Sequence, residues 1–218
     1  MLEISNAGRR IRGEWIWNDL NLHLRPGDRL GLEGPTGSGK TLFLRCLAGL
    51  DDLDRGSIRF CSKALSEWDL RQYRAAVALI AQVPSLFPGS VEQNLRSPWA
   101  LAVHRTRDFD RERVVSWLGR FGRDESFLEA HSEDLSGGER QIVAFLRAIQ
   151  LDPRVLLLDE PASSLDPEQA RVLETIVEEW KGERPDRAVV WTSHRVDQLE
   201  RVTDRRLVLG PDQERSGQ

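Results

Sequence analysis

The chain has 218 residues and a net charge of −4, with 39% hydrophobic and 30% charged residues. This composition is typical of a folded soluble protein and excludes an intrinsically disordered one. Acidic and basic side chains are nearly balanced, whereas a general nucleic-acid-binding protein needs a basic face. We therefore expect no nucleic-acid partner.

The cysteine content and the length of the apolar segments bear on the redox compartment of the protein and on whether it spans a membrane. Cys46 and Cys61 are too few for a disulfide framework, which favours a reducing compartment. The first ten residues lack the apolar segment of a secretory signal. Apolar runs such as 155–158 are far shorter than the roughly 18–20 residues that cross a bilayer. We expect a chain that does not span a membrane by itself.

Short apolar runs alternate with helical patterns along the chain. Leu20, Leu22 and Leu24 alternate with polar residues, which predicts a strand with one wet face. Further strands are predicted at 29–33, 76–81, 155–158, 188–192 and 206–209, and helices at 142–149 and 172–180. The run 155–158 is apolar on both faces, as expected of a central parallel strand. This alternation predicts an α/β fold with a parallel sheet.

The stretch from about Pro84 to Ser136 interrupts this alternation. It contains several Pro and Gly residues, no clear strand, and a helical pattern around 114–121. We interpret the chain as a single domain in which a helical subdomain is inserted into an α/β core. The predicted boundaries are 1–83 and 146–218 for the core and 84–145 for the inserted subdomain.

Two segments of biased composition carry no functional prediction. The Arg-rich residues 105–123 also include Asp108, Asp110 and Glu112, so we interpret them as a solvated helix face. The tail, residues 211–218, is polar and is expected to be disordered.

A glycine-rich motif follows the predicted strand 29–33. Residues 34–41 fit the pattern G-x-x-x-x-G-K-[ST], and an apolar helix is predicted after them. The glycines permit a tight turn whose N–H groups point at one anion, and the helix start adds its positive dipole end. We expect Lys40 to reach β- and γ-phosphate oxygens and the Thr41 hydroxyl to ligate Mg²⁺. The predicted nucleotide-binding residues here are Gly34, Pro35, Thr36, Gly37, Ser38, Gly39, Lys40, Thr41 and Leu42.

Two adjacent carboxylates follow the apolar run 155–158. Asp159 and Glu160 stand at the carboxyl end of the predicted strand, where ligand sites of parallel sheets lie. Asp159 is placed to hold Mg²⁺ directly or through water, and Glu160 is the candidate general base that orients the attacking water. The alternative is an Asp that only caps the next turn. The nearby motif that ends in Lys40 disfavours it, because Mg²⁺-dependent phosphoryl chemistry needs such an acid.

A second glycine-rich helix start lies at residues 135–141, Leu-Ser-Gly-Gly-Glu-Arg-Gln. Ser136 and Glu139 match a capping box, which is a sufficient structural reason for both. The box does not explain Gly137 and Gly138, which leave bare N–H groups able to touch an anion. A nucleotide already held by the first glycine-rich loop needs no second helix start from the same chain. The sequence therefore favours a second copy that uses it.

These motifs, in this order, resemble those of the ATP-binding cassette (ABC) ATPases. Leu-Ser-Gly-Gly-Glu is similar to the signature of that family, and it lies after a Walker A and before a Walker B motif. Three further positions match by spacing. Gln82 is similar to the Q-loop glutamine, Ser164-Leu-Asp166 to the D-loop, and His194 to the switch histidine. The resemblance covers nearly the whole chain.

The resemblance implies a P-loop NTPase (RecA-like) core with an antiparallel β edge and an inserted helical subdomain. It also implies a Mg²⁺-dependent ATPase that forms a head-to-tail homodimer. Two ATP molecules would lie between residues 34–41 of one copy and 136–139 of the other. The implied partner is a separately encoded transmembrane permease, which would place the protein in the cytoplasm, peripheral to the inner face of the cell membrane.

The same resemblance assigns a role to each matched residue. Glu160 would polarise the attacking water, and His194 would contact the γ-phosphate. Gln82 would sense Mg²⁺ and the γ-phosphate and link them to the helical subdomain. Asp166 would pass information across the dimer interface. The implied metal ligands are Thr41, Gln82 and Asp159.

The segment 82–94, followed by Pro98 and Trp99, resembles the stretch that faces a coupling helix of the membrane subunit. Leu86, Phe87 and Trp99 are candidate apolar anchors there, and the alternative is that they fill the core of the helical subdomain. This stretch and the compact length most resemble bacterial iron-export-type ATP-binding subunits. Metal export is thus the implied transport.

A soluble ABC ATPase with a mechanical role on DNA or ribosomes is the alternative function. It is disfavoured because the chain has neither long coiled-coil heptads nor a second cassette. Four positions depart from the family pattern: Ile11, Leu42, Ile142, where an Arg is common, and Arg195, where an Asp is common. Ile11 stands where an aromatic residue usually stacks on adenine, so we expect contact from Ile11 or Trp15 and a relaxed preference for ATP over GTP. Leu42 replaces a common hydroxyl, which predicts one fewer contact to the α-phosphate.

Overall fold

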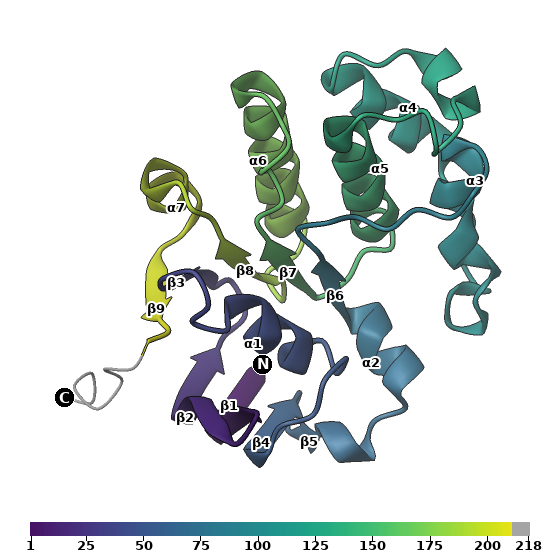
Figure 1. The fold of residues 1–218 in the computed structure, drawn as a ribbon. Helices are drawn as coiled ribbons and strands as arrows, with labels where there is room; N and C mark the ends of the chain where they lie inside the picture. The colour runs from purple at the N-terminus through teal and green to yellow at the C-terminus, as the bar shows by residue number, and fades with distance from the viewer. Residues whose placement is uncertain (211–218) are drawn as a thin grey trace.

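The computed structural model describes residues 1–210, which form two β-sheets with helices packed around them (Figure 1). One sheet is antiparallel with the strand order β2-β1-β4-β5, and the other is parallel with the order β6-β7-β8-β3-β9. The strands are β1 (Leu2–Ile11), β2 (Glu14–Leu24), β3 (Arg29–Glu33), β4 (Arg55–Phe60), β5 (Lys63–Ala64), β6 (Val77–Ile80), β7 (Val155–Asp159), β8 (Ala188–Thr192) and β9 (Arg205–Val208).

Seven α-helices lie in the described part of the chain, with short 3₁₀ helices between them. The α-helices are α1 (Lys40–Leu47), α2 (Leu70–Ala76), α3 (Val91–Arg96), α4 (Arg111–Arg120), α5 (Gly137–Ile149), α6 (Pro167–Gly182) and α7 (Val196–Val202). The 3₁₀ helices are η1 (Leu65–Glu67), η2 (Ser97–Ala100), η3 (Ala102–His104) and η4 (Glu125–Glu129). No helix within residues 1–210 has the length and apolar content needed to cross a bilayer.

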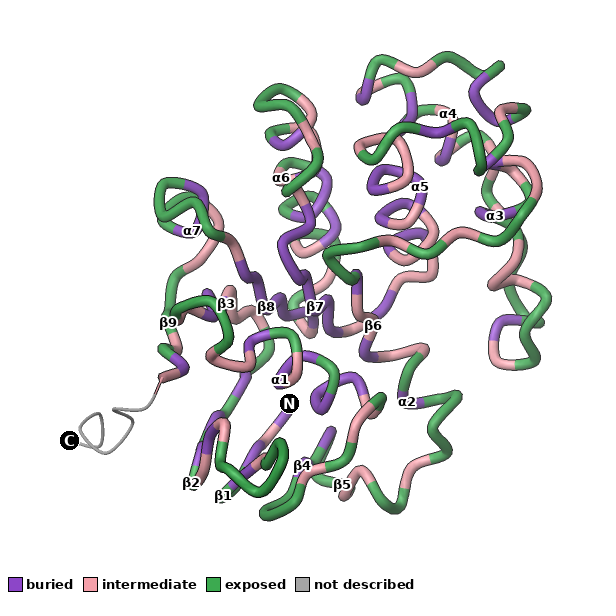
Figure 2. Tube along the Cα trace, in the orientation of Figure 1, coloured by how far each residue is buried: buried purple, intermediate pink, exposed green. Residues whose placement is uncertain are grey.

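The parallel sheet separates two apolar cores. In β7, Leu156 and Leu158 belong to a core shared with α3, α4, α5 and α6, whereas Val155 and Leu157 belong to a core shared with α1 and the antiparallel sheet. Successive strand side chains point to opposite faces, so a strand that serves both cores must be apolar throughout. Every residue of β7 and β8 is buried, as Figure 2 shows.

The helices on one face of the sheet come mostly from a long insertion. The chain leaves the sheet at the end of β6 and returns at β7, the neighbouring strand, after passing through α3, α4 and α5 (Figure 1). Their apolar side chains share one core with α6, which follows β7. Residues 84–145 stay our proposed limits of the helical subdomain.

The predicted fold class is confirmed: a P-loop NTPase core of parallel strands is accompanied by an antiparallel sheet and a helical insertion. Strands β1, β4 and β5 and helices α2 and α7 were not predicted. β1 carries Asn, Gly and Arg residues and its pairing with β2 has several register shifts, so no regular alternation marks it. The predicted disorder of the tail concerns residues that lie outside the described part of the chain.

Candidate nucleotide and metal site

The glycine-rich loop connects β3 to α1 at the carboxyl edge of the parallel sheet. Gly37 and Gly39 have φ angles of 83° and 86°, a region that favours glycine. A Cβ atom on Gly39 would lie 2.6 Å from Cγ2 of Ile16 and 2.9 Å from Nε1 of Trp17. Strand β2 therefore packs directly against the loop, and only glycine fits at position 39.

Lys40 begins α1 and folds back over the loop. Its Nζ donates to the carbonyl oxygen of Gly34 at 2.7 Å and lies 3.2 Å from that of Pro35. The N-cap residue, Gly39, has no side chain to cap the helix, so the first N–H groups of α1 face the loop without a side-chain acceptor. A buried ammonium group and uncapped helix N–H groups around one turn suit a phosphate chain.

The ends of β7 and β8 hold the two predicted carboxylates through one threonine. Asp159 and Thr192 are paired across the two strands. The Thr192 hydroxyl donates to Oδ1 of Asp159 at 3.0 Å and accepts from the backbone N–H of Glu160 at 2.9 Å. Sequence reasoning missed Thr192. The available signal was a hydroxyl at the carboxyl end of the predicted strand 188–192.

Glu160 lies at the meeting point of three predicted residues. Its side chain is largely buried, and its φ of 48° lies in the left-handed region. Oε1 of Glu160 is 2.6 Å from Nε2 of His194, and the Gln82 side-chain amide donates to Oε2 at 3.3 Å. Both oxygens of the candidate base are therefore held, one from the segment after β8 and one from the segment after β6.

Three oxygen atoms are available for a divalent cation. The Thr41 hydroxyl, the amide oxygen of Gln82 and Oδ2 of Asp159 have no hydrogen-bond partner within residues 1–210. Mg²⁺ prefers such oxygen donors and is usually held by one or two carboxylates together with substrate phosphates. One carboxylate, one hydroxyl and one amide oxygen are hard donors that leave positions for phosphate oxygens and water, so the donor set fits Mg²⁺ bound with a nucleotide.

At the second glycine-rich helix start, Ser136 and Glu139 form hydrogen bonds with each other. The Ser136 hydroxyl and backbone N–H both donate to Oε2 of Glu139, at 2.7 and 2.8 Å, and Oγ of Ser136 accepts from the Glu139 N–H. These hydrogen bonds lower the pKa of Glu139, and Arg123 at 3.2 Å adds to the effect. The capping box expected from the sequence is present at the start of α5.

The D-loop packs directly against this helix start. A Cβ atom on Gly138 would lie 2.8 Å from the carbonyl oxygen of Ser164, so the close approach of the D-loop backbone requires glycine. Asp166 accepts a hydrogen bond from the N–H of Gln169 and caps α6. Gly137, the first residue of α5, is exposed to solvent.

The phosphate loop and the signature helix belong to opposite faces of the parallel sheet. Helix α1 packs in the core shared with the antiparallel sheet, and α5 packs in the other core (Figure 1). Within one copy, the chain brings Gln82, Glu160 and His194 into contact, with Asp159 beside them, at the edge of the sheet that also carries the loop 34–41. It leaves residues 136–139 and Asp166 as a separate surface.

The hairpin of β1 and β2 carries both residues that were expected to contact the base. The Trp15 ring lies beneath the Arg10 guanidinium at 3.9 Å and covers Gly8, where a Cβ atom would lie 2.7 Å from the ring. Trp15 is therefore engaged by its own hairpin. Ile11 is 48% exposed at the hairpin end and is available for contact with a base.

The three candidate anchors of segment 82–99 have different surroundings. Leu86 packs against the helical core, as the alternative interpretation expected. Phe87 is 61% exposed. Trp99 is partly buried, and its Nε1 donates to Oε1 of Gln150 at 3.2 Å.

Comparison with known proteins agrees with this geometry. A family model described as "ABC transporter" matches residues 17–163. The chain is 32% identical over 211 residues to the "Probable iron export ATP-binding protein FetA" of Escherichia coli (strain K12), covering 97% of this chain and 92% of that protein. It is 36% identical over 214 residues to the "Aliphatic sulfonates import ATP-binding protein SsuB 1" of Pseudomonas fluorescens, covering 97% of this chain and 74% of that protein.

Solved structures show the same fold. The "Structure of ATP binding subunit of ABC transporter" superposes with a TM-score of 0.85 at 24% identity, covering 95% of this chain and 85% of that one. A dimeric post-hydrolysis state of an ATP-binding cassette bound to ADP and Pi has a TM-score of 0.81 at 23% identity, covering 96% and 94%. The chain belongs to the ABC transporter family. The expectation of an ATP-binding ATPase that uses ATP and Mg²⁺ is confirmed.

Proposed function

We propose that this chain is the ATPase subunit of a metal exporter, in which two copies close on two ATP molecules and drive a separately encoded transmembrane permease. The observation that carries the mechanism is the convergence of His194 and Gln82 on the two oxygens of Glu160. It supports a site in which Glu160, His194 and Gln82 are already positioned around the place that the γ-phosphate would occupy. The protein would act in the cytoplasm, held at the membrane by the permease.

The proposed roles follow the surroundings of each residue. Residues 34–41 hold the triphosphate through backbone N–H groups and the Lys40 ammonium. Mg²⁺, when bound, neutralises phosphate charge and orients the γ-phosphate. Glu160 accepts a proton from the attacking water, and His194 donates a hydrogen bond toward the γ-phosphate. Thr192 keeps Asp159 and the Glu160 backbone in place.

The second copy would complete the site. The exposed start of α5 presents N–H groups that no nucleotide of its own chain can use, because α1 and α5 lie on opposite faces of the sheet. Residues 136–139 of one copy then cover the ATP of the other, and Asp166 lies beside the same interface. Ile11, the exposed residue of the hairpin, contacts the base through apolar atoms only, which supports a weak preference for ATP over GTP.

The metal-export assignment is supported by the match to FetA, which covers 97% of this chain and 92% of that protein. Import subunits for sulfonates and phosphate match at 36% and 34% identity, so the transport experiment below is what tests the assignment.

The test is the Glu160→Gln variant. Removing the base should lower the rate of phosphate release by about 10²- to 10³-fold while ATP still binds, and the variant should elute as an ATP-bound dimer in size-exclusion chromatography. Glu112→Gln, an exposed glutamate of α4, is the matched control and should behave like the wild type. A strictly monomeric Glu160→Gln variant at saturating ATP contradicts the proposed dimer.

The partner that stimulates the wild-type ATPase distinguishes a transport function from a mechanical role on DNA or ribosomes. Reconstitution with the proposed permease should raise the ATPase rate, and iron(II) transport into sealed vesicles should depend on ATP. Stimulation by DNA or ribosomes instead of the membrane protein would establish the mechanical alternative.

A further inference from the structure

His194 lies on a short loop, residues 193–195, that connects β8 to α7 (the His194 loop). Its side chain is 58% exposed, and Glu160 is the one polar partner of its ring within residues 1–210. An exposed side chain on a loop has little packing of its own to fix it. The position of the imidazole ring therefore depends on the contacts of the neighbouring residues.

Ser193 anchors this loop from outside the ATP site. Its neighbours, Thr192 and His194, contact the two carboxylates of the site, whereas the Ser193 hydroxyl donates to Oε1 of Gln198 on α7 at 2.8 Å. The same hydroxyl accepts from the backbone N–H of Arg195 at 3.0 Å. A hydroxyl bonded to the backbone two residues further on closes a tight turn, and this turn encloses the backbone of His194.

Gln198 is buried, and both polar atoms of its side chain are used. The residue is only 2% exposed. Its Oε1 accepts from Ser193, and its Nε2 donates to Oε1 of Glu174 on α6 at 2.8 Å. A buried amide with one partner for its acceptor and one for its donor has a single satisfactory orientation. Gln198 thus forms a fixed bridge between the His194 loop and α6.

Glu174 is a firm attachment point for this bridge. Its side chain is largely buried and lies 3.1 Å from the Arg201 guanidinium, which also pairs with Asp197. The negative charge of Glu174 is therefore compensated, as a carboxylate withdrawn from water requires. Because Gln198 and Arg201 both belong to α7, helices α6 and α7 are bound to each other at this point.

Helix α6 connects this attachment point to the D-loop. Asp166 of the D-loop caps α6, and Glu174 lies about two turns further along the same helix. Leu173, next to Glu174, is buried in the core that α6 shares with β8. The His194 loop is therefore tied, through Gln198, to a packed helix that begins at the D-loop.

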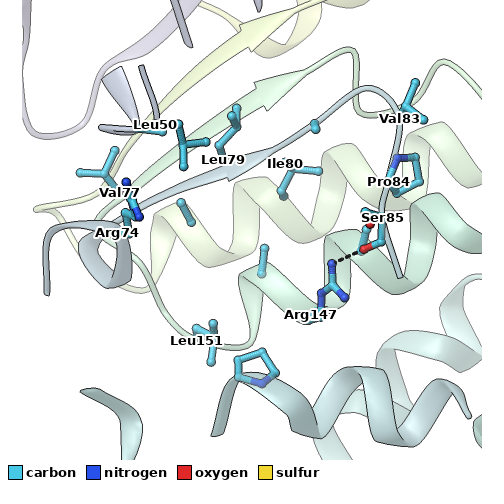
Figure 3. Close-up of a pocket in the computed structure, with 16 residues that line it drawn as sticks. Leu50, Arg74, Val77, Leu79, Ile80, Val83, Pro84, Ser85, Arg147 and Leu151 are labelled. Carbon is cyan, nitrogen blue, oxygen red and sulfur yellow. Dashed lines mark hydrogen bonds between the residues drawn. The ribbon is translucent and has the colours of Figure 1, made fainter. Parts of the chain in front are cut away.

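The segment that carries Gln82 is anchored elsewhere. Arg147 of α5 donates to the carbonyl oxygen of Ser85, three residues after Gln82, at 2.7 Å, as the dashed line in Figure 3 shows. This anchor comes from the helical insertion, whereas Gln198 ties the His194 loop to α6. A change at Gln198 should therefore disturb His194 and leave Gln82 in place.

We propose that Gln198 is a positioning residue for ATP hydrolysis: by bridging Ser193 and Glu174, it holds the His194 loop where His194 reaches Glu160 and the γ-phosphate. The inference rests on the proposed function, because Gln198 acts through the role proposed there for His194. Both polar contacts of the Gln198 side chain lie outside the phosphate loop, so its loss should lower turnover without changing how that loop binds ATP. The same bridge makes the position of the His194 loop depend on α6, and so on the D-loop.

The first test is Gln198→Met, which keeps the length of the side chain and removes both hydrogen bonds. The turnover number of the purified chain should fall roughly 10- to 100-fold, because a reacting group displaced by about 1 Å loses that much. KM and the calorimetric affinity for ATP should stay at the wild-type values, since the lost interaction is one made in the transition state. Gln72→Met, at an exposed glutamine of α2, is the matched control and should behave like the wild type.

Calorimetry also separates positioning from a loss of folding. The number of ATP sites titrated per chain gives the folded fraction of Gln198→Met. Turnover per titrated site is then compared with that of the wild type. Wild-type turnover per site overturns the proposal, and so does a loss of ATP affinity in step with the loss of turnover.

An exchange of the two bridging partners tests the bridge itself. Gln198→Glu alone sets a second carboxylate against Glu174, and like charges in a buried place repel, so turnover should fall. In Gln198→Glu/Glu174→Gln the amide and the carboxylate have changed places, Ser193 keeps an acceptor and Arg201 keeps an oxygen. This double variant should recover most of the wild-type turnover. Turnover at or below that of Gln198→Glu alone overturns the proposal.

A His194→Ala background distinguishes two failures. His194→Ala should itself lower turnover, and Gln198→Met should then have no further effect, since Gln198 acts only through His194. An additive loss in the double variant overturns the inference and leaves the proposed function in place. Wild-type turnover of His194→Ala alone overturns the role proposed for His194 and the inference with it.

Discussion

At the carboxyl ends of β7 and β8, side chains from distant segments meet within one chain: Thr192 holds Asp159, while Gln82 and His194 hold Glu160. At the start of α5, the Ser136 and Glu139 side chains contact one another, and Gly137 is exposed to solvent. The first region is organised before any partner arrives. The second is a rigid surface whose ligand must come from elsewhere, so the two should respond differently to mutation.

The largest expected effect is at the phosphate loop. Lys40→Ala removes the ammonium group that lies over residues 34–35 and should weaken ATP binding by about a hundredfold, since a hydrogen bond to a charged group contributes about 1.5–3 kcal/mol. Calorimetric titration with ATP measures the change. The loss should be the same at every protein concentration, because this half of the site acts in a single copy. Lys63→Ala, an exposed lysine of β5, serves as the control.

The next effect concerns the threonine that sequence reasoning missed. Thr192→Val keeps the shape but leaves the buried N–H of Glu160 without its acceptor, which should lower the free energy of unfolding by about 1–3 kcal/mol. The turnover number should fall as well, because Asp159 loses the hydroxyl that positions it. Thr192→Ser retains the hydroxyl and should restore both values. Equal damage from Ser and Val would show that packing, and not the hydroxyl, matters here.

A smaller and different effect is expected at the second region. Ser136→Ala removes the N-cap of α5 and should cost about 1 kcal/mol of stability. ATP binding by a single copy should be unchanged, while hydrolysis should fall and depend more steeply on protein concentration. Ser90→Ala removes the matching capping box of α3 and should cost similar stability without changing hydrolysis. If both variants hydrolyse ATP like the wild type, the start of α5 has only a structural role.

The smallest effect is a dependence of stability on pH. Hydrogen bonds from Ser136 hold the pKa of Glu139 below its usual range, so the carboxylate stays ionised in the folded protein to lower pH than in the unfolded chain. Its contribution is therefore present above the unfolded pKa of about 4.3 and is lost as the pH falls through the lower folded pKa. Urea unfolding at pH 7, 5, 4 and 3.5 should show the gap between wild type and Glu139→Gln shrinking below about pH 4.3. A gap that widens on acidification contradicts this.

The ends of β7 and β8 and the start of α5 also differ in how much of their structure could be predicted from the sequence. The parallel strands were predicted because a strand buried on both faces is apolar without interruption, as 155–158 is. The capping box at Ser136 was predicted because its hydrogen bonds are local. Contacts between distant segments were not visible. Thr192 on Asp159 depends on which strands are neighbours, and spacing does not give that order.

Irregular and non-local features account for the rest of what the sequence could not show. β1 shifts register against β2 at several points, so its side chains follow no simple alternation. Trp17 contacts Gly39 only because β2 packs against the phosphate loop. Leu86 is partly buried whereas Phe87 is exposed, and Asn94 of α3 holds the backbone of Phe87 through two hydrogen bonds. The sequence alone does not show which of two neighbouring apolar loop residues is buried and which is exposed.

The path of the chain between β6 and β7 has a consequence for engineering. Those strands are adjacent and parallel, so the insertion begins at the carboxyl end of β6 and ends at the amino end of β7, and exchanging it for that of a relative would leave the order of the strands intact. Yet Leu173, Ile176 and Trp180 of α6 belong to the same core as the inserted helices. A chimera that transplants residues 81–154 alone would pair a foreign surface with the native α6 stripe. Grafts that carry α6 along with the insertion should fold more readily than grafts that stop at β7.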